Sequence, residues 1–184
     1  MHFISNHYKN IVKYDFFNKF NLRDVQEVPE IKKIVVNINC RTTDFKNLLT
    51  SLFVLELITV KKGEFTKSNT TNISVKVRKG FPVGCKVQLK NPQCFFFLEK
   101  LFNQIFPDVK QFNSIDFKLT ETKNSVDFRI KKLFDLVELE PHYRFFKNVQ
   151  RLDVSIVTSS KSYLKTLFLL KSFRFPVSTQ HLKH

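Results

Sequence analysis

Two segments of alternating polarity, joined by a glycine-bounded turn, constrain the fold of this chain more than any other feature. In residues 73–78 and 83–89, apolar side chains alternate with polar or cationic ones, which is the period of a strand with one buried face. Gly80-Phe-Pro-Val-Gly84 predicts a turn, because glycine allows unusual backbone angles and proline stiffens the chain. Paired as a hairpin, the strands would carry on their polar face Lys76, Arg78, Lys86, Gln88 and Lys90.

The same alternation predicts further strands at residues 31–40, 125–130 and 152–157. In the first of these, Lys33 and Asn37 lie on the polar side and would extend the cationic face if this strand joins the same sheet. Strands that are apolar on a single face favour a largely antiparallel sheet over a doubly wound one. We therefore expect an α+β fold, with helices packed on one face of a mostly antiparallel sheet and a basic RNA-binding face on the other.

Apolar residues at helical spacing predict four helices: within residues 7–20, after Asp44, after Asn91-Pro92 and after Ser160. The aromatic stripe of the third helix is interpreted as core and not as a base-stacking platform. In the second helix we expect the core to be contacted by a stripe of five residues, namely Phe45, Leu48, Leu49, Leu52 and Phe53.

No internal repeat or linker divides the 184 residues, so a single domain covering residues 1–184 is expected. Residues 61–71 are polar and basic and predict a long loop, and residues 108–148 show little pattern outside the strand at 125–130. The expected parts of the domain are an N-terminal helix and connection (1–30), the first half of the sheet with its helices and a basic loop at 61–74 (31–107), the second half (108–177) and a tail (178–184).

The charge of the chain indicates a polyanionic partner. There are 31 Lys and Arg against 16 Asp and Glu, a net charge of +15, and a folded domain with such an excess repels itself unless it works beside a polyanion. Disorder is not expected, since 42% of the residues are hydrophobic and 22 are Phe. Nucleic acid is the leading candidate and an anionic membrane surface the second, while no apolar run is long enough to span a bilayer.

Residues that carry catalysis or bind metals show no functional pattern. Cys40, Cys85 and Cys94 include no C-x-x-C pair, and the five His residues have no metal-ligand spacing. Three Gly residues are too few and too scattered for a phosphate-binding loop. We therefore expect no enzymatic activity, no catalytic residue, no metal, no cofactor and no small-molecule substrate.

The amino-acid usage indicates an A+T-rich organellar genome. The chain has no Ala, no Trp and only three Gly, whereas Phe, Lys, Asn and Ile are abundant. A folded domain does not need to avoid Ala, so mutational bias is the simpler explanation. Residues 1–21 contain neither an apolar signal region nor an Arg- and Ser-rich presequence. We expect a protein made and used in the mitochondrial matrix, with a plastid as the alternative.

Three segments occur in the order and at the spacing of one protein family, over nearly the whole chain. The first runs from His7 to Asn37 and includes Val25-Gln-Glu-Val-Pro29-Glu-Ile-Lys-Lys-Ile-Val-Val-Asn37. The second and most specific is Val75-Lys-Val-Arg-Lys-Gly80-Phe-Pro-Val-Gly84-Cys-Lys-Val-Gln-Leu89, and the third is Arg151-Leu-Asp153-Val-Ser-Ile-Val-Thr-Ser-Ser-Lys161 with Ser172-Phe-Arg-Phe-Pro176. They resemble the bacterial-type large-subunit ribosomal protein five family, which attaches 5S rRNA to the large subunit.

The resemblance implies an α+β fold whose helix-free sheet face binds 5S rRNA. It also implies a loop near the peptidyl-site tRNA and a contact with a small-subunit protein across the subunit bridge. The 5S-binding positions of the family correspond to Asn37, to Lys61, where a Gln-Lys-Pro motif is lost, and to Gln88, where Thr is usual. A Gly-rich central stretch is replaced by residues 113–124. The tRNA-side loop corresponds to residues 61–74 and includes Lys61, Lys62, Lys67, Ser68 and Asn69.

These observations predict a structural constituent of an organellar large ribosomal subunit that binds 5S rRNA and neighbouring large-subunit rRNA in the central protuberance. Peptidyl-site tRNA and other ribosomal proteins, including a small-subunit bridge protein, are further expected partners, and a membrane is not. The alternatives are a basic RNA-binding protein outside the ribosome and a peripheral membrane protein. The residues expected to bind rRNA are Lys33, Asn37, Lys61, Lys76, Arg78, Lys86, Gln88 and Lys90.

Overall fold

A single antiparallel sheet runs through the molecule. The computed structural model describes residues 3–40, 44–71, 73, 77–105, 116–119, 125–130, 133, 138–146, 149, 151–160 and 162–175. Within these residues six strands are hydrogen-bonded in the order β2-β3-β1-β6-β5-β4, and every pair is antiparallel. The strands are β1 (Ile31–Asn39), β2 (Glu64–Lys67), β3 (Pro82–Leu89), β4 (Asp116–Leu119), β5 (Ser125–Ile130) and β6 (Leu152–Thr158).

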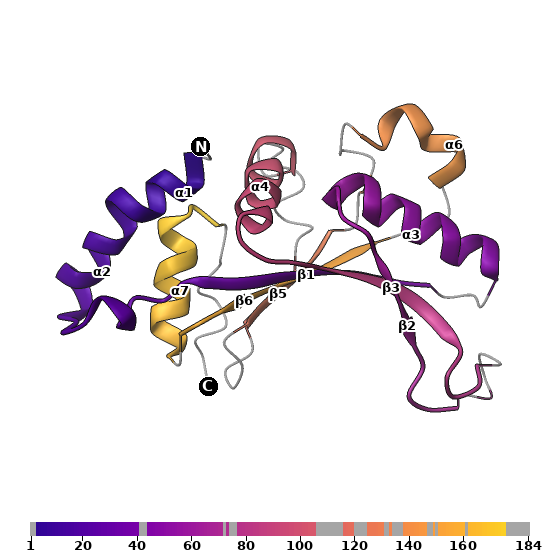
Figure 1. The fold of residues 1–184 in the computed structure, drawn as a ribbon, viewed down its shortest axis with the longest axis horizontal. Coiled ribbons are helices and arrows are strands. Elements are labelled where there is room, and N and C mark those ends of the chain that lie inside the picture. The colour runs from indigo at the N-terminus through magenta and orange to yellow at the C-terminus, as the bar shows by residue number, and fades with distance from the viewer. Residues whose placement is uncertain are drawn as a thin grey trace.

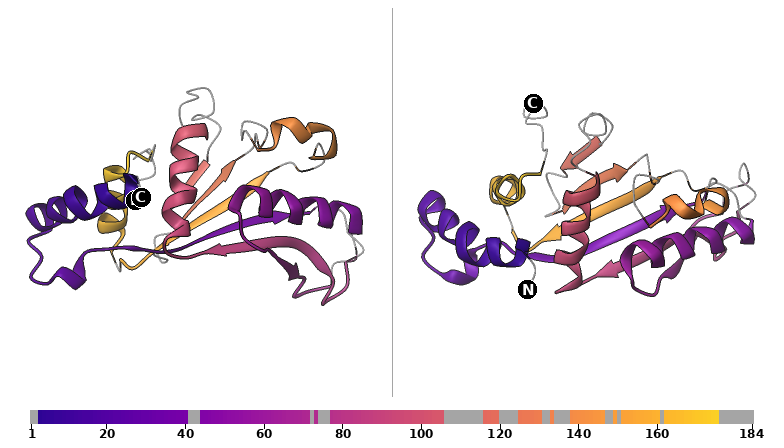
Figure 2. Two further views of the ribbon diagram at one scale, coloured as in Figure 1. Left: turned by 45° about the horizontal axis from the view of Figure 1, so that its top comes forward. Right: turned by 90° about the horizontal axis from the view of Figure 1, so that it is seen from above.

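Helices cover one face of this sheet, as Figures 1 and 2 show, with α3 and α4 lying across it and α1, α2 and α7 grouped at one end. Their bounds are α1 (Phe3–His7), α2 (Lys13–Phe20), α3 (Phe45–Thr59), α4 (Gln93–Lys100), α6 (Tyr143–Phe146) and α7 (Tyr163–Ser172). A π-helical turn, Tyr8–Val12, joins α1 to α2, and another, Leu101–Ile105, extends α4. Short 3-10 turns occupy Val25–Glu27 and Glu140–His142. In the described part of the chain, no helix is long and apolar enough to cross a membrane.

The core lies between the sheet and these helices, and it follows the predicted alternation. In β1, Ile34, Val36 and Ile38 are buried while the residues between them are partly open to solvent. Helix α4 contributes Phe97 and Leu98 to the same apolar cluster. Each fully buried side chain of this size stabilises the fold by about 1.5–3 kcal/mol relative to an exposed one. The α+β architecture with one covered sheet face is therefore confirmed.

The partner of β3 on the outer edge of the sheet differs from the predicted hairpin. Its neighbour is β2, in the register Glu64↔Lys86, Phe65↔Cys85 and Thr66↔Gly84, so part of the expected loop at 61–71 is a strand. Residues 74–76 lie outside the described residues, and Ile73 is exposed. A four-residue strand is too short to produce a readable alternation, which is why the sequence did not reveal it.

Only part of the predicted turn at residues 80–84 is a turn. It lies at Arg78–Phe81, where the Phe81 N–H donates to the Arg78 carbonyl at 3.1 Å, and Gly80 supplies a positive φ of 88°. Pro82 to Gly84 already belong to β3. A Cβ on Gly84 would lie 2.6 Å from the Ile38 carbonyl oxygen, so this glycine lets β1 and β3 approach closely.

Helix α3 contacts the sheet with a different side from the one predicted. Leu48 is buried as expected and Leu52 is half-buried, but the remaining core contacts come from Val54, Leu55 and Ile58. Three residues of the predicted buried stripe are exposed, namely Phe45, Leu49 and Phe53. Because α3 is apolar on nearly all sides, its periodicity does not decide which side meets the sheet.

Candidate nucleic-acid interface

The sheet face opposite α3 and α4 carries a row of polar side chains that crosses five strands. Register pairs connect Glu64 to Lys86, Lys86 to Asn37, Asn37 to Asp153 and Asp153 to Arg129. Residues paired in register point to the same side of a sheet. The row therefore lies across the middle of the open face, with cations and carboxylates in alternation.

Ion pairs hold the two cations of this row in place. Lys86 Nζ lies 3.8 Å from a carboxylate oxygen of Glu64. The Arg129 Nε–H donates to Asp153 Oδ1 at 2.7 Å. Both pairs are partly exposed, so each contributes little to stability. Their effect is to position charged groups on an otherwise flat surface, the shorter pair more firmly than the longer one.

Asn37 lies at the centre of the row with an unused acceptor. Its Nδ2 donates to Asn39 Oδ1 at 3.1 Å, and Asn39 Nδ2 in turn donates to Asp153 Oδ2 at 3.4 Å. The Asn37 side-chain oxygen is buried and has no hydrogen-bond partner among the described residues. A buried acceptor left in this state costs about 1–3 kcal/mol, so a ligand that donates a hydrogen bond here recovers that free energy.

The structure brings Lys61 and Gln88 together beside this row. Lys61 Nζ donates to the Gln88 carbonyl oxygen at 2.7 Å, and Gln88 pairs with Val35, two residues before Asn37 on β1. The three positions taken from the family resemblance therefore form one cluster on the open face. Lys33 lies on the same side of β1, and Lys90 follows β3 with an exposed side chain.

Other predicted site residues lie elsewhere. Arg78 is in the turn at the tip of the β2–β3 arm, which projects beyond the rest of the sheet (Figure 1), and Lys76 lies outside the described residues. Lys62 precedes β2 and Lys67 ends it. Ser68 continues the arm, because its N–H donates to the Phe81 carbonyl at 2.8 Å, and Asn69 follows with an exposed side chain.

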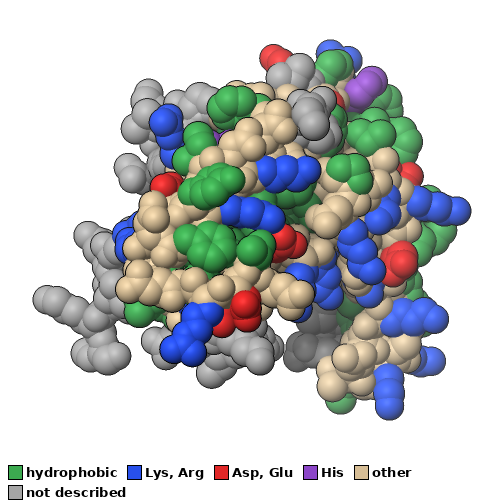
Figure 3. All heavy atoms as spheres, turned by 60° about the vertical axis from the view of Figure 1, so that its left-hand side comes forward, with side chains coloured by type: hydrophobic (Ala, Val, Ile, Leu, Met, Phe, Trp, Pro, Cys, Tyr) green, Lys and Arg blue, Asp and Glu red, His purple; other side chains and the backbone are tan. Residues whose placement is uncertain are grey.

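Two residues of the central row, Arg129 and Asp153, were not recognised from the sequence. Both lie on the polar side of predicted strands, so their orientation was available from the alternation. What the sequence lacked was the register that places β5 and β6 beside β1. Positive charge alone does not identify the site either, because Figure 3 shows Lys and Arg side chains among apolar and acidic ones at the end formed by the N-terminal helices.

Comparison with known proteins gives consistent matches. Residues 82–177 match the family model for the C-terminus of the ribosomal uL5 proteins. The chain is 33% identical to the large ribosomal subunit protein uL5m of Reclinomonas americana, over 97% of this chain and 99% of the relative. It is 31% identical to uL5 of Nitrosomonas europaea and 32% identical to that of Wigglesworthia glossinidia brevipalpis, each over 92% of this chain and 95% of the relative. The chain belongs to the ribosomal uL5 family.

The chemistry of the described residues agrees with a family of structural proteins. Burial raises the pKa of the Cys85 thiol to about 12 and also raises the pKa of Cys94, so neither thiol is a ready nucleophile. No group of His, Cys, Asp and Glu within the described segments has the arrangement of a metal site. What this uL5-family chain presents instead is a surface of amides, ammonium groups and carboxylates.

Proposed function

We propose that this protein is a structural constituent of an organellar large ribosomal subunit and that its open sheet face binds 5S rRNA. The observation that carries the proposal is the cluster around Asn37, where a buried unpaired acceptor lies between Lys86 and Asp153 in register. Asn37 and Gln88 suit a ribose or a base edge, which offer donors and acceptors. The ammonium groups around them suit phosphates.

The two ion pairs of the row assign different roles to its cations. The pair Lys86–Glu64 is long and exposed, so a phosphate replaces Glu64 at little cost. The pair Arg129–Asp153 is short and its carboxylate is also bound by Asn39, so Arg129 remains in place. Lys33, Lys86 and Lys90 are therefore the expected phosphate contacts, and they fix the register of the RNA on the sheet.

The β2–β3 arm is the part of the molecule proposed to approach peptidyl-site tRNA. It extends away from the sheet and ends in an exposed turn. The cations Lys62 and Lys67 are exposed along it, and Arg78 lies at the tip. Projection and positive charge are what contact with a distant polyanion requires, and they support the tRNA contact together with neighbouring large-subunit rRNA.

The proposed location is a mitochondrial ribosome, with a plastid ribosome as the alternative. The composition indicates an A+T-rich genome, and the relative from Reclinomonas americana is named uL5m. Other ribosomal proteins, including a small-subunit protein at the subunit bridge, are the remaining proposed partners.

The test is the affinity of the full-length protein for the 5S rRNA of the same organelle, with unrelated RNA of equal length as competitor. Asn37→Ala combined with Lys86→Ala removes one unpaired acceptor and one cation from the open face. Lys171→Ala removes one exposed cation from α7 and is the matched control.

Specific binding that the double variant loses and the control keeps supports the sheet-face site. Equal affinity for both RNAs would contradict specific 5S recognition and favour a general RNA-binding protein. Binding to anionic vesicles in preference to RNA would favour the membrane-surface alternative.

A further inference from the structure

Helix α3 presents a second apolar stripe on the side that does not contact the sheet. Phe45, Leu49 and Phe53 are 66%, 44% and 56% exposed, and their spacing of four residues places them on one side of the helix. The stripe is about 12 Å long, since a helix rises by about 1.5 Å per residue. A helix that is apolar on two sides is normally buried on both.

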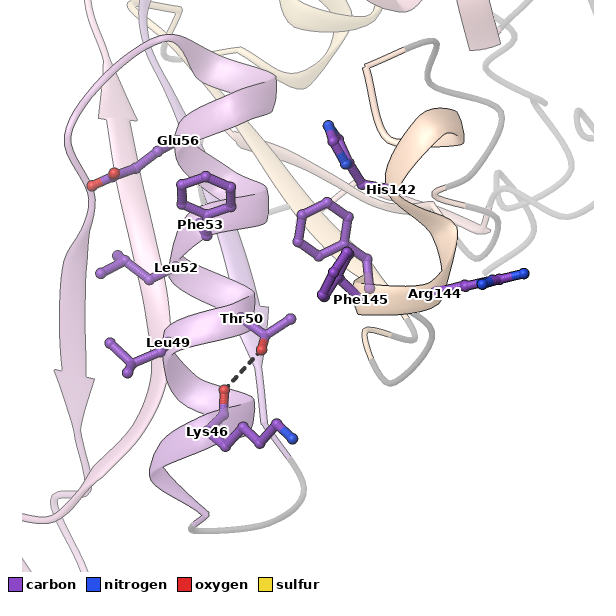
Figure 4. A pocket seen from close by; sticks show the side chains of 10 residues that line it. Lys46, Leu49, Thr50, Leu52, Phe53, Glu56, His142, Arg144 and Phe145 are labelled. Atoms are coloured by element: carbon purple, nitrogen blue, oxygen red, sulfur yellow. Dashed lines mark hydrogen bonds between the residues drawn. The ribbon is translucent and has the colours of Figure 1, made fainter.

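A second element completes a groove next to this stripe. The α3–α6 groove has a volume of about 660 Å³ and is lined on the α3 side by residues that include Leu49, Leu52 and Phe53. The other side is formed by His142, Phe145 and Phe146. Figure 4 shows Phe53 on one side of this space with His142 and Phe145 opposite. The ring centroids of Phe53 and Phe146 are 6.2 Å apart, so the two elements touch at the base of the groove.

The charged groups at the edge of the groove are mainly cationic. Lys46 lies at the N-terminal end of α3 and Arg144 on the outer side of α6 (Figure 4), and neither forms an ion pair with a described residue. Glu56 is the single acidic lining residue, and its Oε1 accepts the Gly63 N–H at 2.9 Å. The electrostatic complement of this edge is a carboxylate.

The shape and the chemistry of the groove favour a protein occupant over RNA. Single-stranded RNA is bound by open aromatic faces that alternate with a line of cations. Here Leu49 and Leu52 supply an aliphatic wall, and the Phe146 ring is partly covered by His142, whose centroid is 6.1 Å away. An aliphatic and aromatic groove along a helix is the form that accepts the apolar side chains of another helix.

We propose that the α3–α6 groove binds an amphipathic helix of a protein partner whose apolar stripe is flanked by acidic side chains. The apolar stripe contacts Leu49, Phe53 and Phe145, and the flanking carboxylates pair with Lys46 and Arg144. This site is separate from the open sheet face, because α3 lies on the opposite side of the sheet. RNA binding and protein docking can therefore occur on one molecule at the same time.

The probe is a fluorescent synthetic helix of about 18 residues, or five turns, with Leu in an i, i+3, i+4, i+7 stripe and Glu beside it. A second peptide has Lys in place of each Glu, and a third is a scramble of the first. Binding to the full-length protein is followed by fluorescence anisotropy. Three protein variants are compared with the wild type: Leu49→Asp with Phe53→Asp, Lys46→Glu with Arg144→Glu, and Leu164→Asp as a control at an exposed apolar residue of α7.

The acidic helix is expected to bind at least about tenfold more tightly than the basic helix and the scramble, a difference of about 1.4 kcal/mol. The Asp variant of the groove loses binding, the control keeps it, and the Glu variant reverses the preference to the basic helix. Retained 5S rRNA binding by both groove variants shows that they are folded. Failure of the acidic helix to bind, or an unchanged preference in the Glu variant, overturns the proposal. A single-stranded RNA oligonucleotide that binds the groove more tightly than the peptide also overturns it.

Discussion

The open sheet face and the α3–α6 groove are both uncovered surfaces, but they differ in how their side chains are satisfied. On the sheet face, Lys86 and Arg129 are paired with carboxylates, and Asn37 is connected to Asp153 through Asn39. In the groove, Phe45, Leu49 and Phe53 are exposed to water, which offers apolar groups nothing in return. The polar face is stable without a ligand, whereas the apolar one gains free energy from any covering that excludes water.

This difference predicts opposite responses to salt. RNA binding to the sheet face releases counterions and weakens as the salt concentration rises. Docking in the groove depends mainly on buried apolar area, so salt affects only the contribution of Lys46 and Arg144. The contrast also exists within α3, whose two apolar sides are predicted to have unequal importance for stability.

The largest expected effect is on the side of α3 that contacts the sheet. Leu55 is fully buried, so Leu55→Ala is expected to lower the free energy of unfolding by about 2–5 kcal/mol through lost burial and a residual cavity. Urea unfolding followed by circular dichroism measures it. A loss below about 1 kcal/mol would contradict the assignment of this side of α3 to the core.

A smaller effect is expected at the connection between α4 and the groove. Lys100 has a side chain that is 9% exposed, and its Nζ lies 2.8 Å from a carboxylate oxygen of Glu138, whose side chain is 30% exposed. It also donates to the Ile58 carbonyl near the end of α3 at 2.9 Å. Lys100→Met leaves Glu138 without this partner and should cost about 1–3 kcal/mol, below the value for fully buried pairs because Glu138 is partly exposed.

The same pair gives the stability difference a pH dependence. Desolvation acts to raise the pKa of Glu138, but hydrogen bonding and attraction to Lys100 outweigh it and lower the pKa from its usual value of 4.5. A lowered folded-state pKa contributes stability above 4.5 that is lost as the pH falls through the folded-state value. The difference between wild type and Lys100→Met should therefore shrink below pH 4.5, as unfolding at several pH values would show. An unchanged difference would argue against this ion pair.

On the sheet face, the expected effects are on binding and not on folding. Lys86→Met should weaken 5S rRNA binding and reduce the slope of log affinity against log salt by about 0.7–0.9. Glu64→Gln is its counterpart, because it releases Lys86 from its carboxylate and should strengthen binding. Anisotropy titrations over a range of salt concentrations measure both. If the two variants shift affinity in the same direction, Lys86 is not a phosphate contact.

The smallest effect is expected on the outer side of α3. Leu49→Gln should change the free energy of unfolding of the isolated protein by no more than about 0.5 kcal/mol, because the side chain already contacts water. Together with Leu55→Ala it separates the two sides of one helix. A loss as large as that of Leu55→Ala would mean that the outer stripe belongs to the core.

Much of the fold could be predicted because alternation reports burial directly. The strands around Ile34, Phe128 and Val154 were recognised in this way, and their alternation also placed Lys33, Asn37, Lys86 and Gln88 on one open face. The remainder depended on information that no local pattern carries. Strands β2 and β4 have four residues each, and the register that brings Arg129 and Asp153 to Asn37 joins strands far apart in the sequence.

The outer stripe of α3 shows a different limit. A stripe at helical spacing was assumed to face the core, and the assumption was wrong for Phe45, Leu49 and Phe53. When a helix is apolar all round, the pattern identifies two possible buried sides and cannot rank them. In this protein the side that the sequence favoured is the one left for a partner.

The most direct test of the sheet-face assignment is lysine footprinting of the full-length protein with and without 5S rRNA. Acetylation of each lysine is measured by mass spectrometry in both states. Protection of Lys33, Lys86 and Lys90, with Lys46 and Lys171 still reactive, is the result expected for RNA bound across the open sheet face. Protection of Lys46 and Lys171 while Lys33, Lys86 and Lys90 remain reactive would place the RNA on the helical side and contradict the account.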